Sequence, residues 1–315
     1  MIFTFQRAVK AQEKARIALD GVTGGGKTWT ALTLGTFFAD KEGGRIAVID
    51  SERSSAKKYA SDFDFDHLTL PDSSPHTYIA AINAAIEGEY SVIIIDSLSH
   101  AWEGTLDLKD SVSKRSRSGN SFDAWREVTP VHNQLIDTML RAPAHIIATM
   151  RTKTEYLVEK DEHTGKSSIS KVGLRPMQRE GVEYEFDIVG DLDTENTLVI
   201  SKTRCSALNG AVVRKPGNEL ARTIWDWLND GEPVVTKEQA SLVVEAFTVF
   251  DSERRTDVKK AFIEIFGRPN ELVISRLDEA MTWIEAQHAA TITPPITPPE
   301  PLAADGGDFD GEDTF

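Results

Sequence analysis

The chain has 315 residues, a net charge of −15 and a hydrophobic fraction of 40%, which indicates a globular protein with one large domain and an appendage. No apolar stretch approaches the roughly 18 to 20 residues that span a bilayer, and the N-terminus lacks the order of a signal peptide, so we expect no membrane partner and a cytoplasmic location. The single cysteine, Cys205, excludes an internal disulfide framework, and the acidic balance excludes a protein that coats duplex DNA by bulk charge, although not a local basic DNA site.

The first 150 residues alternate near-continuous apolar runs with helical patterns. The runs are "RIALDG" (16–21), "RIAVIDSE" (45–52), "YSVIIIDSLS" (90–99) and "AHIIATM" (144–150), as expected of parallel strands buried on both faces. Helical patterns occupy 27–40 and 77–88, and an apolar stripe surrounds Thr129-Pro130, which marks a helix start or a kink. This order predicts a doubly wound α/β domain with a mostly parallel central sheet.

The pattern changes after residue 150. Residues 152–173 predict a hairpin, 186–204 a second antiparallel pair with a turn at 193–196, and 219–230 the closing helix of the domain. Residues 236–289 form a separate helical block that opens on a capping box of Thr236 and Gln239. The Pro-rich, acidic end cannot bury enough apolar surface to fold alone. We therefore expect a large α/β core at 1–232, a helical accessory domain at 236–289 and a disordered tail at 290–315.

The stretch "GVTGGGKT" follows the first apolar run. Gly21, Gly26, Lys27 and Thr28 satisfy G-x-x-x-x-G-K-[ST], with a strand before the loop and a helix after it. Backbone N–H groups of such a loop surround phosphate oxygens, the lysine reaches the β- and γ-phosphates, and the hydroxyl binds Mg²⁺. The simpler alternative is a coincidental Gly-rich turn. We predict ATP and Mg²⁺ as cofactors, with nucleotide contacts from Gly21, Val22, Thr23, Gly24, Gly25, Gly26, Lys27, Thr28 and Trp29.

Acidic residues at strand ends are candidates for metal binding and catalysis. Asp96 ends "SVIIID" and, with Thr28, is predicted to hold Mg²⁺; the alternative is a helix N-cap. Many P-loop ATPases place a catalytic Glu directly after this Asp, but here the position is Ser97. Glu52, after the second strand, is therefore the candidate that activates water, with Asp50 as a second candidate and a solvated loop acid as the simpler alternative.

The glycine loop, the strand-end Glu52 and the "DSLS" after the third strand resemble the RecA-type ATPase core over roughly residues 14–230. The resemblance implies a base at Glu52 and a polar sensor at Thr149, with Arg151 close by. More narrowly, "TMRTKTEYLVE", "KVGLRPMQREGVEYEFDIVGDLD" and "SKTRC" resemble phage-encoded RecA-like ATPases, some of which are single-strand annealing recombinases. The resemblance therefore implies a RecA-like P-loop fold and a role on single-stranded DNA in a bacterial host.

The resemblance also gives meaning to "SKTR" (201–204). In RecA-like and related hexameric motors, a pair of cations on a late strand reaches the γ-phosphate of the neighbouring subunit. Lys202 and Arg204 are two residues apart and so share a strand face. This predicts a homo-oligomer, a ring or a filament, in which the pair acts in trans. An ordinary solvated strand face is the alternative.

Two basic segments lie where RecA-like proteins place their DNA loops. The first, 108–122, reads as a mobile loop, and the second is 152–180; each could instead be a solvated surface. The last 25 residues carry six acids and end on Phe315, like the tails of bacterial single-stranded-DNA-binding proteins, so they could bind such a partner, occupy the chain's own DNA site, or only solubilise. The predicted DNA contacts are Lys109, Lys114, Arg115 and Arg117 in the first segment, and Lys166, Lys171, Arg175 and Arg179 in the second.

These features predict an ATP-hydrolysing recombination or replication protein that acts on single-stranded DNA. Three alternatives stay open. A helicase or helicase loader would unwind a forked duplex, and a nucleotide-ordered DNA-binding module would show no turnover. A small-molecule P-loop kinase is disfavoured by the Lys202 and Arg204 pair and by the lack of a compact lid in the sequence.

Overall fold

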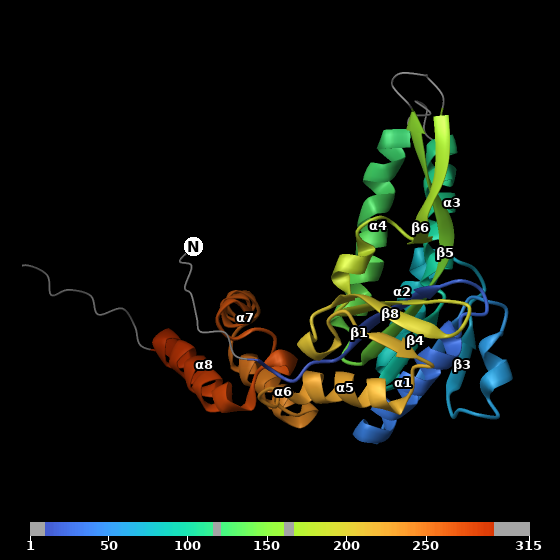
Figure 1. Cartoon of the computed structure of the whole chain (residues 1–315). Coiled ribbons are helices and arrows are strands. Elements are labelled where there is room, and N and C mark those ends of the chain that lie inside the picture. The colour runs from blue at the N-terminus through green and yellow to red at the C-terminus, as the bar shows by residue number, and fades with distance from the viewer. Residues whose placement is uncertain (1–9, 116–120, 161–166, 293–315) are drawn as a thin grey trace, which may run out of the picture. The chain divides into compact units, whose positions relative to one another are not determined.

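The computed structural model describes residues 10–115, 121–160 and 167–292 (Figure 1). Packing divides the chain into two units, Met1–Gly231 and Glu232–Phe315. In the described part of the chain, no helix is long and apolar enough to cross a membrane. The predicted tail from residue 293 lies outside the described residues.

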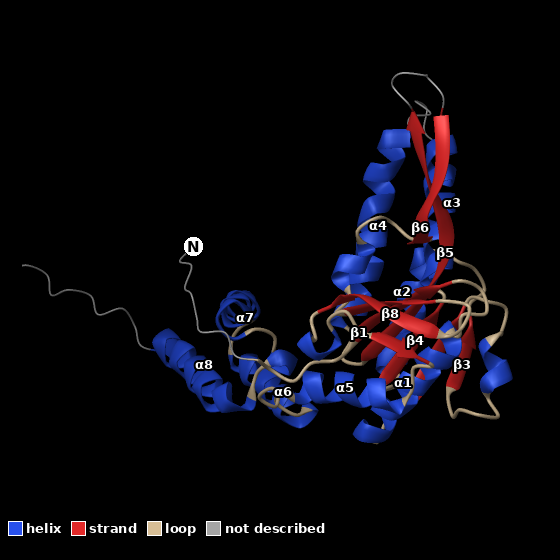
Figure 2. Cartoon of the chain, in the orientation of Figure 1, coloured by secondary structure: helices blue, strands red, loops and turns tan. Residues whose placement is uncertain are grey.

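A nine-stranded sheet forms the centre of the first unit (Figure 2). Its order is β3-β2-β4-β5-β1-β7-β8-β9, and β6 pairs with β5. The first six strands of this order run parallel, whereas β8, β9 and β6 pair antiparallel. The predicted fold class, a mostly parallel α/β sheet with antiparallel additions, is therefore confirmed. The strands are β1 (Arg16–Gly21), β2 (Ile46–Asp50), β3 (Asp66–Thr69), β4 (Val92–Asp96), β5 (His145–Lys160), β6 (Ser167–Pro176), β7 (Ile188–Leu192), β8 (Thr197–Thr203) and β9 (Val212–Arg214).

Helices cover both faces of the sheet because its central strands bury alternate side chains on opposite sides. On β1, Ile17 and Leu19 pack in one core with α1 and α5, whereas Ala18 packs in another with α2 and α4. The helices of this unit are α1 (Lys27–Glu42), α2 (Pro75–Glu87), α3 (Leu98–Arg115), α4 (Ser121–Arg141) and α5 (Asn218–Asn229).

Several local predictions differ from the structure. The predicted hairpin forms, but its first run is continuous with the predicted strand at 144–150, so that β5 reaches Lys160 and its second half pairs antiparallel with β6. Of the segment 108–122 that was predicted as a mobile loop, residues 108–115 form the end of α3, whose Val112 packs against Ala124 and Val128 of α4, and residues 116–120 lie outside the described residues. Pro130 lies inside α4 and does not start it. The short strands β3 and β9 were not expected. Figure 1 shows α3, α4 and the β5–β6 hairpin extending together beyond the sheet.

The second unit is helical and has its own core. It contains α6 (Lys237–Ala246), α7 (Ser252–Phe266) and α8 (Leu277–Ile292). The predicted capping box forms at the start of α6, where Thr236 Oγ1 accepts from the Gln239 backbone N–H and the Gln239 side chain accepts in return. Phe247, Phe262 and Phe266 pack in the core of this unit. Helix α8 continues to Ile292, three residues past the predicted end of the block.

Strand β1 buries an acid directly before the glycine loop. Asp20 is 1% exposed, and its Oδ1 has no hydrogen-bond partner among the described residues. Its parallel partner on β7 is Asp191. Burial, together with the charges of Asp191 and Glu183, raises the pKa of Asp20 to about 8 against the opposing effect of Lys27. The folded protein therefore keeps Asp20 protonated at neutral pH.

This buried carboxyl makes stability depend on pH. Between the ordinary pKa of 3.8 and the folded value of about 8, the folded state holds a proton that the unfolded state releases, so stability falls as pH rises. One such group costs up to about 1.4 kcal/mol per pH unit in this window. Asp20→Asn is neutral throughout, so we expect it to melt close to wild type at pH 5 and progressively above it toward pH 9. Melting curves of both proteins at each pH measure this, and parallel pH profiles would contradict it.

Candidate nucleotide site

The glycine loop lies at the carboxyl edge of the sheet, between β1 and α1. Strands β1, β2, β4, β5 and β7 run parallel, so their carboxyl ends meet at this edge. Gly21 has φ 148°, and a Cβ there would lie 2.3 Å from the carbonyl oxygen of Leu192. Gly26 has φ 86° and is the N-cap of α1. The loop therefore needs glycine at both positions, and the N-terminus of α1 begins at its last glycine, where a helix favours a bound anion.

Lys27 lies against the loop that it follows. Its Nζ donates to the carbonyl oxygens of Gly21 at 2.9 Å and Val22 at 2.8 Å. Burial lowers the pKa of Lys27, while the nearby acids Asp96 and Glu52 act in the opposite direction. The predicted phosphate-binding lysine and the predicted acids thus share one site, as the sequence pattern required.

Asp96 joins the loop to the neighbouring strand. Its Oδ2 accepts from Thr28 Oγ1 at 2.8 Å, and its Oδ1 accepts from Thr149 Oγ1 at 2.5 Å. Burial raises the pKa of Asp96, and these two hydrogen bonds oppose the rise. The alternative role as a helix N-cap is not what the side chain does here, since both oxygens are turned to the hydroxyls of other elements.

The oxygens of Thr28 and Asp96 fit a magnesium site. Mg²⁺ prefers hard oxygen ligands and usually takes one or two protein oxygens beside water and nucleotide phosphates. No group of three His, Cys, Asp or Glu residues suited to a metal occurs within the described residues. A carboxylate and a hydroxyl beside a phosphate loop match that sparse protein contribution, so these two residues are the ones that would hold the ion.

Asp50 ends β2 and Glu52 lies two residues further on, but the two carboxylates make different contacts. Asp50 is fully buried; its Oδ1 accepts from the Glu52 backbone N–H at 2.5 Å, and its Oδ2 from the backbone of Ala56 and the ring of His67. These contacts hold the turn after β2, so Asp50 has no free oxygen with which to activate water. The side chain of Glu52 is 26% exposed, and its Oε1 accepts from Arg151 Nε at 2.8 Å. Glu52 remains the candidate base.

The turn between β7 and β8 forms a wall of the site that the sequence did not reveal. A Cβ on Gly25 would lie 2.9 Å from the carbonyl oxygen of Asp193, and one on Gly26 would lie 3.0 Å from the side-chain nitrogen of Asn196. The sequence predicted the turn but not its neighbour, because 170 residues of chain separate it from the loop.

Trp29, at the start of α1, is 45% exposed, and its ring packs edge-on against Phe63 at 4.9 Å.

Lys202 and Arg204 lie away from the chain's own glycine loop. Lys202 is level with Val189 on β7, which is level with Ala18, three residues before the loop. Because β8 runs antiparallel, Arg204 lies further toward the opposite edge of the sheet. Lys202 Nζ donates to three carbonyl oxygens, those of Glu183, Tyr184 and Phe186, and Arg204 Nη1 donates to Asp187 Oδ1 at 2.5 Å.

Five of the candidate DNA residues lie on elements that extend beyond the sheet: Lys109, Lys114 and Arg115 on α3, and Lys171 and Arg175 on β6. Lys109 pairs with Asp110 at 2.6 Å and lies over the ring of Trp125, whereas Lys114 and Arg115 are exposed at the end of α3. Arg179 Nη1 donates to Asn133 Oδ1 at 3.3 Å. Arg117 and Lys166 lie outside the described residues. Lys171 and Arg175 are on β6, and only their backbone is described.

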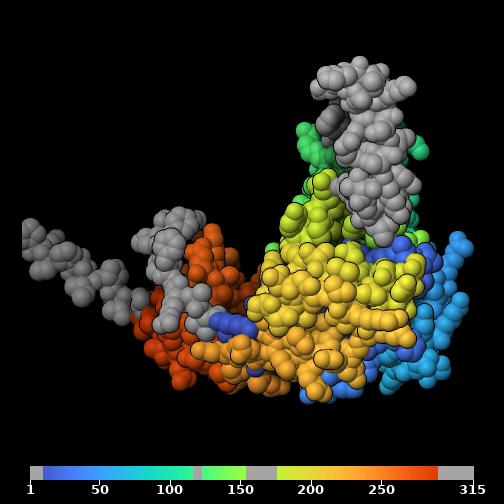
Figure 3. Space-filling view, viewed as in Figure 1, coloured from blue at the N-terminus to red at the C-terminus, as the bar shows by residue number. Residues whose placement is uncertain are grey.

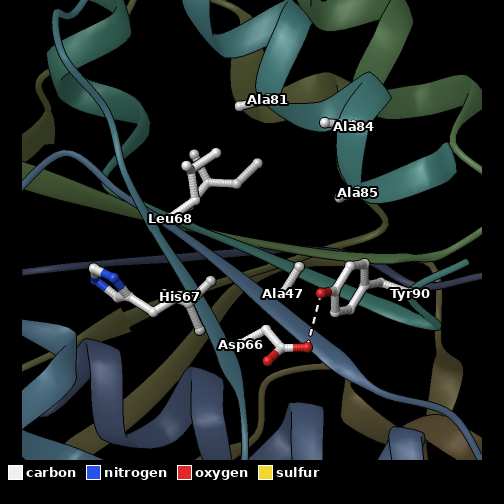
Figure 4. Close-up of a pocket in the computed structure, with 10 residues that line it drawn as sticks. Ala47, Asp66, His67, Leu68, Ala81, Ala84, Ala85 and Tyr90 are labelled. Atoms are coloured by element: carbon white, nitrogen blue, oxygen red, sulfur yellow. Dashed lines mark hydrogen bonds between the residues drawn. The ribbon is translucent and has the colours of Figure 1, made fainter. Parts of the chain in front are cut away.

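A separate hollow lies at the outer edge of the sheet, between β3 and α2 (Figure 4). Three alanines of α2 leave the space, and Leu68 of β3 borders it. Figure 4 shows the hydroxyl of Tyr90 beside Asp66, to whose Oδ2 it donates at 2.7 Å. Its lining includes no residue of the glycine loop and neither Glu52 nor Asp96, so we do not assign it to the nucleotide site.

Comparison with known proteins identifies the family of the first unit. No curated protein matches the chain. Among solved structures, it is similar to the KaiC-like protein PH0186 from the hyperthermophilic archaeon Pyrococcus horikoshii OT3, with 17% identity, a TM-score of 0.35, and coverage of 60% of this chain and 78% of that one. Residues 13–215 match the family described as an AAA domain, and they include the glycine loop, Asp96 and Lys202. The chain therefore belongs to the AAA domain family of P-loop ATPases.

Proposed function

We propose that this protein hydrolyses ATP with Mg²⁺ and that it acts on single-stranded DNA in recombination or replication. The observation that carries the ATPase part is the convergence of three groups on one loop. Lys27 lies in the loop, Asp96 accepts from Thr28 at 2.8 Å, and Glu52 occupies the adjacent strand end. Phosphate binding, metal binding and water activation thus have separate groups within one site.

Each group has a distinct chemical task in this proposal. The loop N–H groups and Lys27 bind the phosphates, and Mg²⁺ held by Thr28 and Asp96 would offset their charge. Glu52 keeps one oxygen, Oε2, that accepts no hydrogen bond from the described residues, and this oxygen would orient and deprotonate the attacking water. Thr149 donates to Asp96, so it links the metal-binding acid to the end of the parallel part of β5.

We also propose that Lys202 and Arg204 act on the nucleotide of a neighbouring copy. Their place toward the far edge of the sheet keeps them from the chain's own loop. Beside them is an exposed aromatic side chain, Tyr184, which is 70% exposed and whose ring centre lies 5.9 Å from Lys202 Nζ. The segment that holds β7 and β8, yellow in the space-filling view, forms the face turned to the viewer (Figure 3). An exposed aromatic group beside cations suits an interface between copies.

Mixing two inactive variants tests action in trans. Glu52→Gln should lower turnover by about 10²- to 10⁴-fold while nucleotide binding persists, because only proton removal is lost. Lys202→Ala should lower turnover through loss of charge stabilisation. A mixture pairs the intact Glu52 of one variant with the intact Lys202 of the other, so we expect ATP hydrolysis well above the sum of the two alone.

The control for this mixture combines Glu52→Gln with Lys27→Ala. Both substitutions lie in the same site, so no interface in that mixture regains a complete set. If Lys202 serves only its own chain, by holding the carbonyl oxygens of Glu183 to Phe186, the test mixture stays as inactive as the control. That result would refute the trans assignment while leaving the ATPase proposal intact.

The DNA part of the proposal rests on the elements that extend beyond the sheet. Lys114 and Arg115 are exposed at the end of α3, and the β5–β6 hairpin starts one residue after Arg151 of the nucleotide site. Backbone-phosphate contacts there would bind single strands without sequence preference. The resemblance to phage-encoded recombinases supports annealing or strand exchange in a bacterial cytoplasm, and the acidic tail ending in Phe315 supports binding to a single-stranded-DNA-binding protein.

Removing the two exposed cations of α3 tests this surface. We expect the double variant Lys114→Ala, Arg115→Ala to bind single-stranded DNA at least about tenfold more weakly. The slope of the logarithm of the binding constant against the logarithm of salt concentration should become shallower by about 1.4, since each phosphate contact contributes about 0.7 to it. Fluorescence anisotropy with a labelled oligonucleotide at several salt concentrations measures both quantities.

The matched control is Lys41→Ala, Arg222→Ala. It removes the same charge from exposed positions on α1 and α5, which cover the other face of the sheet. If both double variants lose the same affinity, bulk charge alone explains binding and the α3 surface is not the DNA site. Unwinding of a forked duplex in the same preparations would instead favour a helicase.

A further inference from the structure

Arg151 occupies the point where the nucleotide site meets the hairpin. It is the last residue of β5 in register with β1, where it lies beside Gly21, the first residue of the glycine loop. The next residue, Thr152, opens the antiparallel pairing with β6 at Pro176. One residue therefore belongs to both the parallel sheet and the hairpin.

The backbone of Arg151 is fixed from two sides. Its N–H donates to Ser99 Oγ at 2.9 Å, and Ser99 is fully buried near the start of α3. Its carbonyl oxygen accepts from the Met177 N–H at 2.7 Å, just after β6 ends. These two bonds fix the point from which the side chain of Arg151 leaves the backbone.

The side chain of Arg151 contacts the candidate base. Its Nε donates to Glu52 Oε1 at 2.8 Å, which leaves Oε2 of Glu52 for a water molecule. The charge of Arg151 is also among the groups that lower the pKa of Lys27, after burial, so the two cations lie within electrostatic reach of each other. Glu52 thus lies between a phosphate-binding lysine and an arginine.

We propose that Arg151 is a positioning residue that holds the Glu52 carboxylate in the orientation from which it activates water. Glu52 follows the end of β2, and on its side-chain atoms the described residues supply only this one hydrogen bond. Without it the carboxylate is free to rotate toward solvent. A base works only within hydrogen-bond reach of its proton, and a misplacement of about 1 Å can cost on the order of 10²-fold in rate.

This role differs from that of a stabilising ion pair. The side chain of Arg151 is 40% exposed and that of Glu52 is 26% exposed, and ion pairs exposed to this extent contribute little to folding. If Arg151 positions the base, its removal lowers turnover while the melting temperature and the nucleotide affinity stay close to wild type. A purely structural role would not give this combination.

The inference rests on the proposed ATPase activity, and the test uses the full-length protein with ATP and Mg²⁺. We expect Arg151→Ala to lower kcat by about 10- to 100-fold with KM for ATP changed less than about threefold. Arg151→Lys should recover part of the loss, because its ammonium can still reach the carboxylate. In a Glu52→Gln background, Arg151→Ala should change residual turnover by less than about threefold, since the group it positions is already gone.

The matched control is Arg141→Ala. Arg141 is also an arginine paired with a carboxylate, Asp137 at 3.0 Å, but on the surface of α4. We expect this variant to keep wild-type kcat, KM and melting temperature. Binding of a fluorescent ATP analogue, measured for every variant, shows whether the glycine loop is intact.

Two results would overturn the inference while leaving the ATPase proposal standing. One is wild-type kcat in Arg151→Ala; the other is an equal loss with and without Glu52, which would mean that Arg151 acts on another group. A higher kcat in Arg151→Ala would also overturn it, because the ion pair would then restrain the base instead of positioning it. If the wild type binds nucleotide but shows no turnover, the proposed function itself fails, and this inference fails with it.

Discussion

The nucleotide site depends on one buried carboxylate. Asp96 ends a strand that is apolar along its whole length, and its two oxygens accept from hydroxyls on two other elements, Thr28 of α1 and Thr149 of β5. Those bonds tie the first turn of the helix after the loop to the middle of the sheet. Burial raises the pKa of Asp96 against these two hydrogen bonds, so a cation bound beside phosphates would stabilise the charged form of this carboxylate.

Burial dominates the electrostatics of the whole edge. It raises the pKa of Asp20 and Asp96 and lowers that of Lys27, so each group is pushed toward its neutral form. Phosphates with a bound cation would bring the missing counter-charges, and the site would gain by holding them. The side chain of Glu52 is 26% exposed and accepts from Arg151 Nε, and in the proposed mechanism this contact places it to activate water.

Much of the core was predictable because its patterns are local. The buried strands show as apolar runs, and β1 was predicted with its observed bounds. The capping box of α6 was also predicted, since three residues suffice to form it. The predictions failed where packing decides: residues 108–115, expected as part of a mobile loop, form the end of α3, whose Val112 packs against α4. The strand at 144–150 and the first run of the predicted hairpin also join into one strand, β5, without a break.

The sequence by itself determined the candidate groups of the site: a glycine loop with its lysine and threonine, a strand-end aspartate, and Glu52 as the candidate base where Ser97 follows that aspartate. Motif spacing carries that information because the glycine loop and the strand-end acids are each set by a few consecutive residues. Only the tertiary structure decided the relations between them. It separated Asp50, used up by hydrogen bonds, from Glu52, placed Asn196 against the loop, and brought Arg151 to Glu52 across 99 residues. Such contacts depend on strand order, and strand order leaves no trace in local sequence.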